Sequence, residues 1–432
     1  MSRTSSRWPL SLRVVIAVAL GILLGALGGT GPLLFGLENN HLGQLGMLVI
    51  RLLKALAVPL ILFAILDAFT HAPIKARSGA RLIAICLLNV SVAFAIGLTL
   101  MNTLEPGRAW QGRVEQLATQ VGTSGAPDKA KVAEASLDPL KNLGGYIPQS
   151  LVEPLVTNNV ISVVLIALLF GAALRRLKER QGETDIADTR PLESLISAAY
   201  QILVKVLGWV VELVPFAVFG LVAQVVGKAG VGIFADLAGF LGVVTLGLCL
   251  HGLVYYPLMA WLAGGKPPRV YLKQGADAVL TGLSANSSLA AIPISLRCLK
   301  TMGVSDNSAR LAVCAGTNLN NDGVTLYEAM TALFLAQAMG YALGAGQQAV
   351  IVFSALMAGA GIAGIPEAGL IVLPLVLSAA GLPEVVVAAA IPLIAPVDWI
   401  IARLRSGVNV LSDMLVAILL DAWERRKAGG TG

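Results

Sequence analysis

Polar residues recur at helical spacing in the last long apolar segment of the chain, residues 394–421. Asp398, Arg405, Asn409 and Asp413 lie in this segment. At about 100° per residue, these positions fall within an arc of about 80°, so the four side chains share one helix face while Arg403 points elsewhere. The segment is long enough to cross a bilayer, where charged side chains are costly and mark functional sites by default. We therefore expect a binding site on this face, with a structural salt bridge as the alternative.

The composition indicates that this helix belongs to a membrane protein. Hydrophobic residues make up 56% of the 432 residues and charged residues 13%, and the mean hydropathy is +0.79. These values are typical of a polytopic membrane protein and not of a soluble one. The first apolar run, 12–37, is too long for a signal peptide, so we expect no cleavable leader. Spanning helices are predicted at 12–37, 44–70, 81–104, 147–175, 194–227 and 233–263.

The net charge of +6 indicates orientation rather than a nucleic-acid partner. Lysine and arginine residues gather in short connections next to the predicted helices, and such connections remain on the cytoplasmic side of a membrane. We therefore expect both termini in the cytoplasm. The polar stretch 105–146 is expected to be an external loop, without a chemical role.

The cysteines and histidines give little support to catalysis. The cysteines lie in apolar segments without metal or disulfide spacing, and no histidine stands beside a candidate nucleophile or ligand cluster. These residues are Cys86, Cys249, Cys298, Cys314, His41, His71 and His251. Intramembrane hydrolysis and transition-metal chemistry therefore lose support.

Two apolar segments are interrupted in the middle by small and polar residues. Residues 274–300 contain LSANSSLAAIP, and residues 348–382 contain MAGAGIAGIPEAG. Two half-helices that meet at a tip can direct backbone N–H groups and hydroxyls at a ligand. Such a pair of segments indicates a transporter site at the bilayer midplane, built as an inverted repeat. One long helix is predicted after each, at 305–340 and at 394–421, and ordinary helices with proline kinks are the alternative.

These motifs resemble a known family, the dicarboxylate/amino acid:cation symporters, which includes the glutamate transporters. The segment NNDG from Asn320 resembles the seventh-helix motif NMDGT, and RSGVNVLSD resembles the eighth helix. GIAGIPEAGLIVL from Gly361 resembles the second re-entrant hairpin, and SANSSLAAIP the first. The resemblance also covers RLLKALAVPLILF from Arg51 and NNVISVVLIALLFGAAL from Asn158, so that it extends over nearly the whole chain.

The resemblance implies an all-α polytopic membrane protein with eight transmembrane helices and two re-entrant helical hairpins in an inverted-repeat architecture. Scaffold helices would occupy 1–80 and 147–230. The transport domain would comprise the third helix at 81–104 and residues 231–432. The family implies a homotrimer in the inner membrane, in contact with lipid, whose transport domains move as elevators. The second hairpin would act as the extracellular gate.

The family motifs assign a substrate site residue by residue. By resemblance, Arg405 binds the distal carboxylate of an acidic substrate, for which its forked guanidinium is suited. Asn409 holds the main-chain part of the substrate, and Ser287 and Ser288 contact it from the first hairpin. The remaining candidates at this site are Gly361, Ala363, Gly364, Asp398 and Ala402.

The resemblance also implies sodium sites made of oxygen ligands, which suit an alkali cation. Asp413 would be the carboxylate of the first site, with oxygens around Gly316, Asn320 and Asn409. Carbonyl groups around Asn318, Gly359 and Ile362 would form a second site. Of a third site, Asn320 and Asp322 remain, while its helix-3 ligands are replaced by Cys86, Asn89 and Val90, so fewer sodium ions are expected to be coupled.

One departure from the family concerns the substrate. The aspartate that pairs with the substrate's α-amino group is Ala402 here. Leaving an ammonium group without its partner in a desolvated site costs about 3–5 kcal/mol. This favours a dicarboxylate without an amino group, such as a C4-dicarboxylate. Asp398, one turn away, offers a partial substitute, so acidic amino acids remain the alternative.

Other departures concern the seventh helix. Asn321 and Val324 replace the methionine and threonine of NMDGT. Glu328 lies where the animal glutamate transporters keep a proton-carrying glutamate, and a buried carboxyl group can carry a proton at neutral pH. We therefore expect coupling to Na⁺, with H⁺ as a further coupled ion, although an ordinary buried glutamate is the alternative. The role of Glu367 is open.

The sequence thus predicts a secondary active symporter that imports a small dicarboxylate, without covalent chemistry. An ion channel and a transport-deficient ligand-binding homologue are alternatives. An intramembrane aspartyl protease using Asp322 and Asp398 lacks a recognisable catalytic motif.

Overall fold

The computed structural model of the chain is helical in nearly every element that it describes. The structure describes residues 10–32, 36–71, 76–111, 147–157, 159–180, 188–317, 320–361, 368–382 and 384–429. Besides helices and turns, this part of the chain contains an isolated bridge between Pro32 and Glu38. The predicted all-α class is confirmed.

Several helices are long and apolar enough to cross a membrane. Among the described residues these are Asn39–Asp67, Gly79–Leu104, Arg190–Val211, Ile233–Leu262 and Val397–Arg426. Shorter apolar helices cover Leu12–Gly28, Val214–Lys228 and Ala345–Gly359. The chain is therefore a polytopic helical membrane protein, while the count of eight spanning helices and two re-entrant hairpins stays a prediction.

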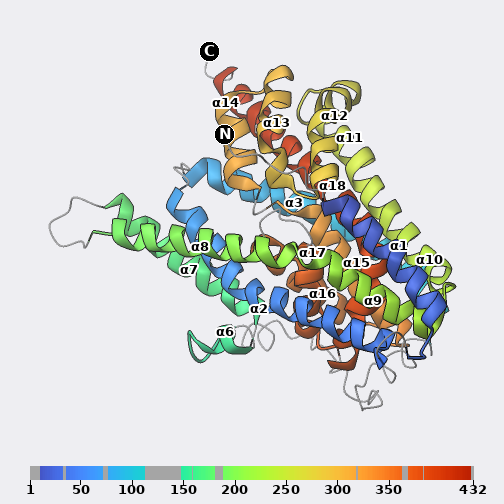
Figure 1. Cartoon of the computed structure of the whole chain (residues 1–432). Coiled ribbons are helices and arrows are strands. Elements are labelled where there is room, and N and C mark those ends of the chain that lie inside the picture. Colours follow the sequence, from blue (N-terminus) through green and yellow to red (C-terminus); the bar gives the residue numbers. More distant parts are fainter. Residues whose placement is uncertain are drawn as a thin grey trace, which may run out of the picture.

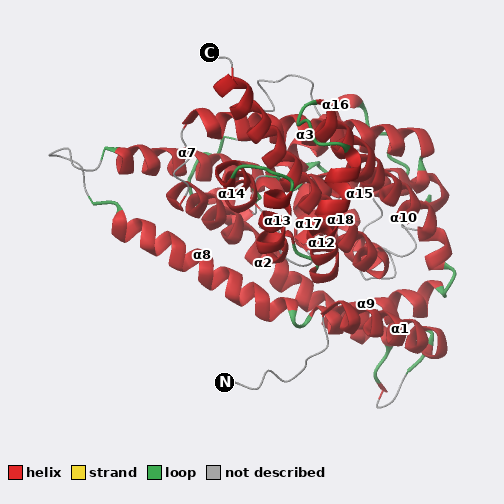
Figure 2. Cartoon of the chain, turned by 90° about the horizontal axis from the view of Figure 1, so that it is seen from above, coloured by secondary structure: helices red, strands yellow, loops and turns green. Residues whose placement is uncertain are grey.

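One group of helices packs around α2 (Asn39–His71). The helices α7 (Val160–Glu179), α8 (Arg190–Val211) and α9 (Val214–Ala229) lie against α2, and α1 (Leu10–Gly28) lies against α9. The short helix α6 (Glu153–Thr157) precedes α7. Figures 1 and 2 show that α7 and α8 extend toward the same side of the molecule, and Figure 2 shows the two helices apart from each other.

Glycines let the helices of this group approach closely. A Cβ atom on Gly25 of α1 would lie 2.7 Å from the carbonyl oxygen of Ala223 in α9. One on Gly220 of α9 would lie 2.2 Å from the carbonyl oxygen of Leu42 in α2. In lipid, helix association depends largely on close packing at small residues, because the surrounding chains are as apolar as the helices. These glycines therefore hold α1, α2 and α9 together.

The second group of helices packs around α15 (Asp322–Ala338), in which every residue except Gln337 is buried. Figure 1 shows α15 within this group, with α3, α16, α17 and α18 in contact with it. The other members are α3 (Ala76–Leu104), η2 (Pro106–Trp110), α10 (Ile233–Cys249), the π-helical turn η4 (Leu250–Tyr255), α11 (Tyr256–Leu262), α12 (Pro268–Ala285), α13 (Ser288–Thr301), α14 (Asp306–Arg310), the π-helical turn η5 (Leu311–Gly316), α16 (Ala345–Gly361), α17 (Ala368–Ala379) and α18 (Glu384–Gly429).

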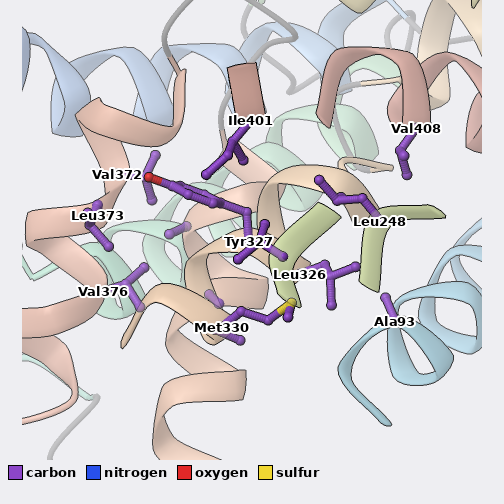
Figure 3. Close-up of a cluster of buried hydrophobic side chains, with 14 of the residues drawn as sticks. Ala93, Leu248, Leu326, Tyr327, Met330, Val372, Leu373, Val376, Ile401 and Val408 are labelled. Carbon is purple, nitrogen blue, oxygen red and sulfur yellow. The ribbon is translucent and has the colours of Figure 1, made fainter. Parts of the chain in front are cut away.

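An apolar cluster fixes α15 from several sides, as Figure 3 shows. Leu326, Tyr327 and Met330 of α15 meet side chains from α3, α10, α17 and α18, namely Ala93, Leu248, Val372, Leu373, Val376, Ile401 and Val408. Close packing of this kind leaves a helix little freedom to shift. The polar residues at the start of α15 are therefore held by a rigid support.

The predicted interruption within 274–300 is present. α12 ends at Ala285, Asn286 takes a left-handed conformation (φ 50°), and the Ser287 hydroxyl caps α13 by accepting from the N–H of Ala290 at 3.3 Å. α12 and α13 pack against each other and against α18. In the second interrupted segment, α16 and α17 also pack against each other. The tip of that segment, 362–367, lies outside the described residues.

The prediction of one long helix over 305–340 is wrong. The chain forms α14 and the π-helical turn η5, leaves the helix, and starts α15 at Asp322. Asn320 and Asn321 are not helical. Polar side chains here compete with the backbone for hydrogen bonds, which favours an interruption. The break places peptide groups and amide side chains in the middle of the second group.

Other predicted helices differ in their ends. The run 194–227 forms two helices, because Pro215 near the start of α9 has no N–H to continue the bonding of α8. The run 12–37 ends as a helix at Gly28, before Gly29 with a positive φ of 51°. The helix predicted at 147–175 starts at Val160, where the Asn159 side chain accepts from the N–H of Ser162 at 3.2 Å.

Candidate substrate and cation site

Arg405 lies buried where α15, α17 and α18 meet. Its Nη2 lies 3.2 Å from Asp398 Oδ2, two turns earlier on α18, and both side chains are nearly inaccessible. Its Cζ lies 4.0 Å from the ring centroid of Tyr327 in α15. The guanidinium group also lies against α17, since a Cβ on Gly369 would be only 1.5 Å from Arg405 Nη1. The charge is thus compensated by Asp398 and stacked on an aromatic ring, an arrangement that tolerates burial.

Asn409 joins α18 to the start of α15. Its Oδ1 accepts from the main-chain N–H of Gly323 at 2.8 Å, and its Nδ2 lies 3.3 Å from Asn321 Oδ1. A Cβ on Gly323 would lie 2.6 Å from the carbonyl oxygen of Arg405, so the two helices approach this closely only at a glycine. The structure therefore brings Arg405 and Asn409 to the same helix crossing.

Asp413 gathers oxygen and amide groups at the break before α15. Asn320 Nδ2 donates to its Oδ1 at 3.0 Å, and Thr317 Oγ1 donates to its Oδ2 at 2.7 Å. Gly316, the last residue of η5, directly precedes Thr317. A carboxylate and a hydroxyl group supply oxygen ligands, which suit a hard alkali cation. The predicted ligand Asn318 lies outside the described residues.

Asp322 lies in a buried cluster with residues of the π-helical segment, and Ser412 joins this cluster to Asn320 and Asp413, since its hydroxyl also lies 3.1 Å from Asn320 Oδ1. The hydroxyl of Tyr256 donates to Asp322 Oδ2 at 2.8 Å, and the Ser412 hydroxyl lies 2.8 Å from the same oxygen. His251 Nε2 is 3.5 Å from it. Nearby, the Tyr255 hydroxyl donates to Asn89 Oδ1 at 3.0 Å. Asp322 therefore has donors from α11 and α18 as well as a close imidazole.

The hairpin α12–α13 brings its serines to the side of α18. Ser406 of α18 donates to Asn286 Oδ1 at 3.1 Å, which attaches the turn to this helix. Ser287 is occupied as the cap of α13. The buried hydroxyl of Ser288 has no hydrogen-bond partner among the described residues. This hydroxyl is therefore free to bond a ligand.

The other predicted site residues differ in how far the structure places them. Ala402 is buried on α18 between Asp398 and Arg405. Gly359 and Gly361 lie in the last turn of α16. Ile362, Ala363, Gly364 and Glu367 lie outside the described residues.

Glu328 is fully buried in α15, and neither of its carboxylate oxygens has a hydrogen-bond partner in the part of the chain that the structure describes. An ionised carboxylate without donors is costly in an apolar interior. The described residues contain no cluster of three or more His, Cys, Asp or Glu side chains that would hold a metal ion.

Several residues of this region were missed by the sequence interpretation. His251 was taken as isolated, and Tyr256, Tyr327, Thr317, Ser412 and Gly369 were not singled out. The segment HGLVYY from His251 places one imidazole and two phenols in an apolar run. That concentration of polar rings is the signal that would have identified it.

A helical membrane fold with interrupted helices is the arrangement expected of a secondary transporter. Comparison with known proteins identifies the family. The sequence pattern of the sodium:dicarboxylate symporter family matches residues 10–423, and the chain belongs to this family. The resemblance inferred from the motifs is thereby confirmed.

Individual relatives are about a quarter to a third identical to the chain over the residues that align. Excitatory amino acid transporter 3 of Mus musculus is 27% identical over 453 residues, which cover 94% of this chain and 83% of the relative. Excitatory amino acid transporter 1 of Ambystoma tigrinum is 27% identical over 475 residues, 96% of this chain and 83% of the relative. Excitatory amino acid transporter 1 of Bos taurus is 33% identical over 271 residues, 62% of this chain and 48% of the relative.

Proposed function

We propose that the protein imports a small dicarboxylate together with cations. The observation that carries this proposal is the buried Arg405 at the crossing of α15, α17 and α18, with Asp398 as its carboxylate partner. A guanidinium group donates two parallel hydrogen bonds to one carboxylate. Arg405 would bind one carboxylate of the substrate, and Asn409 and the free Ser288 hydroxyl would contact the rest.

The engagement of Asp398 supports a substrate without an amino group. Asp398 was the candidate to replace the missing carboxylate at Ala402, but its Oδ2 contacts Arg405 and its charge is compensated there. An ammonium group at this place would compete with the guanidinium. Leaving it unpaired in a desolvated site costs about 3–5 kcal/mol.

Acidic amino acids are the second candidate substrates. The relatives named above are excitatory amino acid transporters, and the Oδ1 atom of Asp398 has no hydrogen-bond partner among the described residues. That oxygen would have to serve the ammonium group. Succinate and aspartate differ only by an amino group at this position, so they are a matched pair for the comparison.

The proposed cation sites are groups of residues that offer oxygen ligands. The family is named for sodium, and Na⁺ would bind at Asp413 with Gly316, Asn320 and Asn409. A further sodium site would use Asn318, Gly359 and Ile362. Asp322 would be one of the ligands kept from a third sodium site of the family. Glu328 is proposed as a proton carrier, and a Glu328→Gln variant whose uptake keeps the pH dependence of the wild type would argue against this role.

The proposed mechanism is elevator-type alternating access. The helices α1, α2, α7, α8 and α9 would form the fixed scaffold of a homotrimer in the inner membrane, with both termini in the cytoplasm. The helices around α15 would move as the transport domain. Helices within each group pack together most extensively, and the groups meet where α2, α7 and α9 contact α16, α17 and α18, which supports this division.

Uptake into proteoliposomes tests the proposal. With an inward Na⁺ gradient, labelled succinate is expected to accumulate above its external concentration, and accumulation is expected to fail without the gradient. Arg405→Ala provides the transport-negative control. Flux without accumulation would support a channel, and binding without uptake would support a ligand-binding homologue; either result would contradict the symporter.

A further inference from the structure

The Asn321 side chain bridges three helices in the middle of the site. Its Nδ2 donates to the main-chain oxygen of Gly359 in α16 at 3.0 Å. Its Oδ1 accepts from Asn409 Nδ2 of α18 at 3.3 Å, and Asn409 Oδ1 accepts from Gly323 N of α15 at 2.8 Å. Asn321 is buried, as are Asn409 and Gly323. An uninterrupted chain of hydrogen bonds therefore joins α15, α18 and α16.

The two ends of this chain determine the orientation of both amide side chains. The main-chain N–H of Gly323 can only donate, so it requires the Asn409 oxygen. The Asn409 NH₂ group then faces the Asn321 oxygen, which turns the Asn321 NH₂ group toward Gly359. A carbonyl oxygen can only accept, so the last bond is consistent with the first. Asn321 thus presents a donor, and not an acceptor, to α16.

The Gly359 carbonyl accepts this donor in the last described turn of α16, which extends to Gly361. In the interior of a membrane protein, an unsatisfied carbonyl group is costly. Either an N–H group or a cation satisfies it, because the C-terminal end of a helix carries partial negative charge. In this protein the Asn321 amide does so.

Close contact between α15 and α16 brings this carbonyl within reach. A Cβ on Gly359 would lie 2.2 Å from Thr325 Cγ2, so the approach requires glycine there. The Thr325 hydroxyl lies 3.2 Å from the Asn321 carbonyl oxygen, one turn earlier, and holds the start of α15. The family motif has methionine at this position, and the methionine side chain carries no N–H group to donate. The bridge is therefore a property of asparagine at this position.

We propose that Asn321 is a positioning residue that holds α16 against α15 and α18 in place of a cation. This inference rests on the proposed function, in which the Gly359 carbonyl is a ligand of the second sodium site, and it concerns the state in which that cation is absent and the Asn321 amide bonds the same oxygen. With the Asn321 amide on that oxygen, the hairpin α16–α17 stays attached without the second cation. The transporter then needs fewer coupled cations to fix this hairpin.

Hydrogen exchange of the purified full-length protein tests the bridge directly. Peptides from residues 345–361 and 368–379 are followed in Na⁺-free buffer with and without added Na⁺. Asn321→Leu keeps the size of the side chain and removes both hydrogen bonds. It is expected to accelerate exchange in these peptides at least tenfold without Na⁺, because two hydrogen bonds that attach α16 are lost. Added Na⁺ is expected to slow exchange more in this variant than in the wild type.

Two further variants keep the test decisive. Asn321→Asp retains the acceptor for Asn409 but turns an oxygen toward the Gly359 carbonyl, so it is expected to accelerate exchange as well. Ser354→Ala removes a buried hydroxyl of α16 that bonds the main-chain oxygen of Val350 in the same helix at 2.7 Å, so it is expected to leave exchange unchanged.

Unchanged exchange in both Asn321 variants would overturn the bridge. An equal response to Na⁺ in Asn321→Leu and the wild type would overturn the replacement of a cation. Neither result depends on which substrate is transported, so failure of the bridge is distinguishable from failure of the proposed function.

Discussion

At the scale of single residues, Arg405 is compensated before a substrate arrives. Asp398 on the same helix pairs with it, and Tyr327 covers one side of the guanidinium group. In the proposed function, a substrate carboxylate would therefore meet a cation that is already fixed in position, so that less conformational entropy would be lost on binding. The same pairing prevents Arg405 from being an uncompensated charge in the interior when the site is empty.

Arg405→Lys is expected to weaken binding of a dicarboxylate although the charge is kept. Lysine is a point donor without the planar fork of arginine. The loss of one charge-assisted hydrogen bond, about 1.5–3 kcal/mol, corresponds to a dissociation constant about tenfold to a hundredfold higher. Isothermal titration with succinate measures it. Arg403→Lys is the matched control, since Arg403 bonds its own helix at the carbonyl of Trp399; equal affinities in both variants would remove Arg405 from the site.

Ala402→Asp is expected to shift selectivity toward acidic amino acids. Ala402 is buried on α18 between Asp398 and Arg405, so a carboxylate there would supply the missing partner of an ammonium group. Competition of aspartate and succinate in the uptake assay gives the ratio of the two affinities. We expect aspartate to gain about tenfold or more relative to succinate, in line with the cost of an unpaired buried charge. If the ratio stays unchanged, the absence of this carboxylate does not determine the substrate.

At the scale of helices, glycines set how closely functional side chains are packed. Gly369 of α17 faces the Arg405 guanidinium group, and Gly323 of α15 faces the Arg405 main chain. The two cases differ in what an added methyl group would displace. At Gly323 it would meet backbone, which cannot move without separating α15 from α18. At Gly369 it would meet the end of a flexible side chain, so the fold can persist while the site changes.

Gly369→Ala is therefore expected to impair binding more than folding. The added Cβ would lie 1.5 Å from Arg405 Nη1 and would force the guanidinium group away from its position. We expect at least a tenfold loss of succinate affinity, with a change in melting temperature of a few degrees at most, because the displaced group is flexible. Gly239→Ala in α10 is the control, since nothing lies within 4 Å of a Cβ there. Wild-type affinity in Gly369→Ala would contradict the contact between α17 and Arg405.

The helices also show what the sequence could and could not predict. Long apolar runs predicted the spanning helices, because length and hydropathy are properties of one segment. The aligned polar face of α18 was likewise visible, since Arg405, Asn409 and Asp413 follow a single periodicity. The breaks between α8 and α9 and before α15 were missed, because a polar or proline residue in an apolar run is compatible with either a kink or an end.

Contacts between distant segments could not be predicted from any one periodicity. Tyr256 and Asp322 are 66 positions apart, and their hydrogen bond depends on how η4 and α11 pack beside α15. Asn321 was noted only as a departure from a motif, whereas its hydrogen bond to Gly359 depends on the close approach of α16. Such pairs result from tertiary packing, for which a single sequence carries no direct signal.

At the scale of the whole molecule, the two helix groups differ in the buried polar contacts inside them. Backbones packed at glycines occur in both, at Gly220 of α9 and at Gly323 of α15, whereas an ion pair and hydrogen bonds between buried side chains hold the helices around α15. A scaffold that stays fixed needs rigid contacts but no binding groups. A part that carries substrate and cations needs polar groups in its interior, compensated by one another when ligands are absent.

Gly220→Val is expected to destabilise the scaffold without changing the binding site. The added Cβ would lie 2.2 Å from the main-chain oxygen of Leu42, which cannot yield, so α9 and α2 must separate at a cost of about 1–3 kcal/mol. The melting temperature is expected to fall by several degrees, while the dissociation constant of succinate in Na⁺ stays within about twofold of the wild type, because every proposed ligand lies in the other group. Gly208→Val in α8 is the matched control, with no atom within 4 Å of its Cβ. If succinate affinity falls together with the melting temperature in Gly220→Val, the two groups are energetically coupled in binding, and an independently moving transport domain is contradicted.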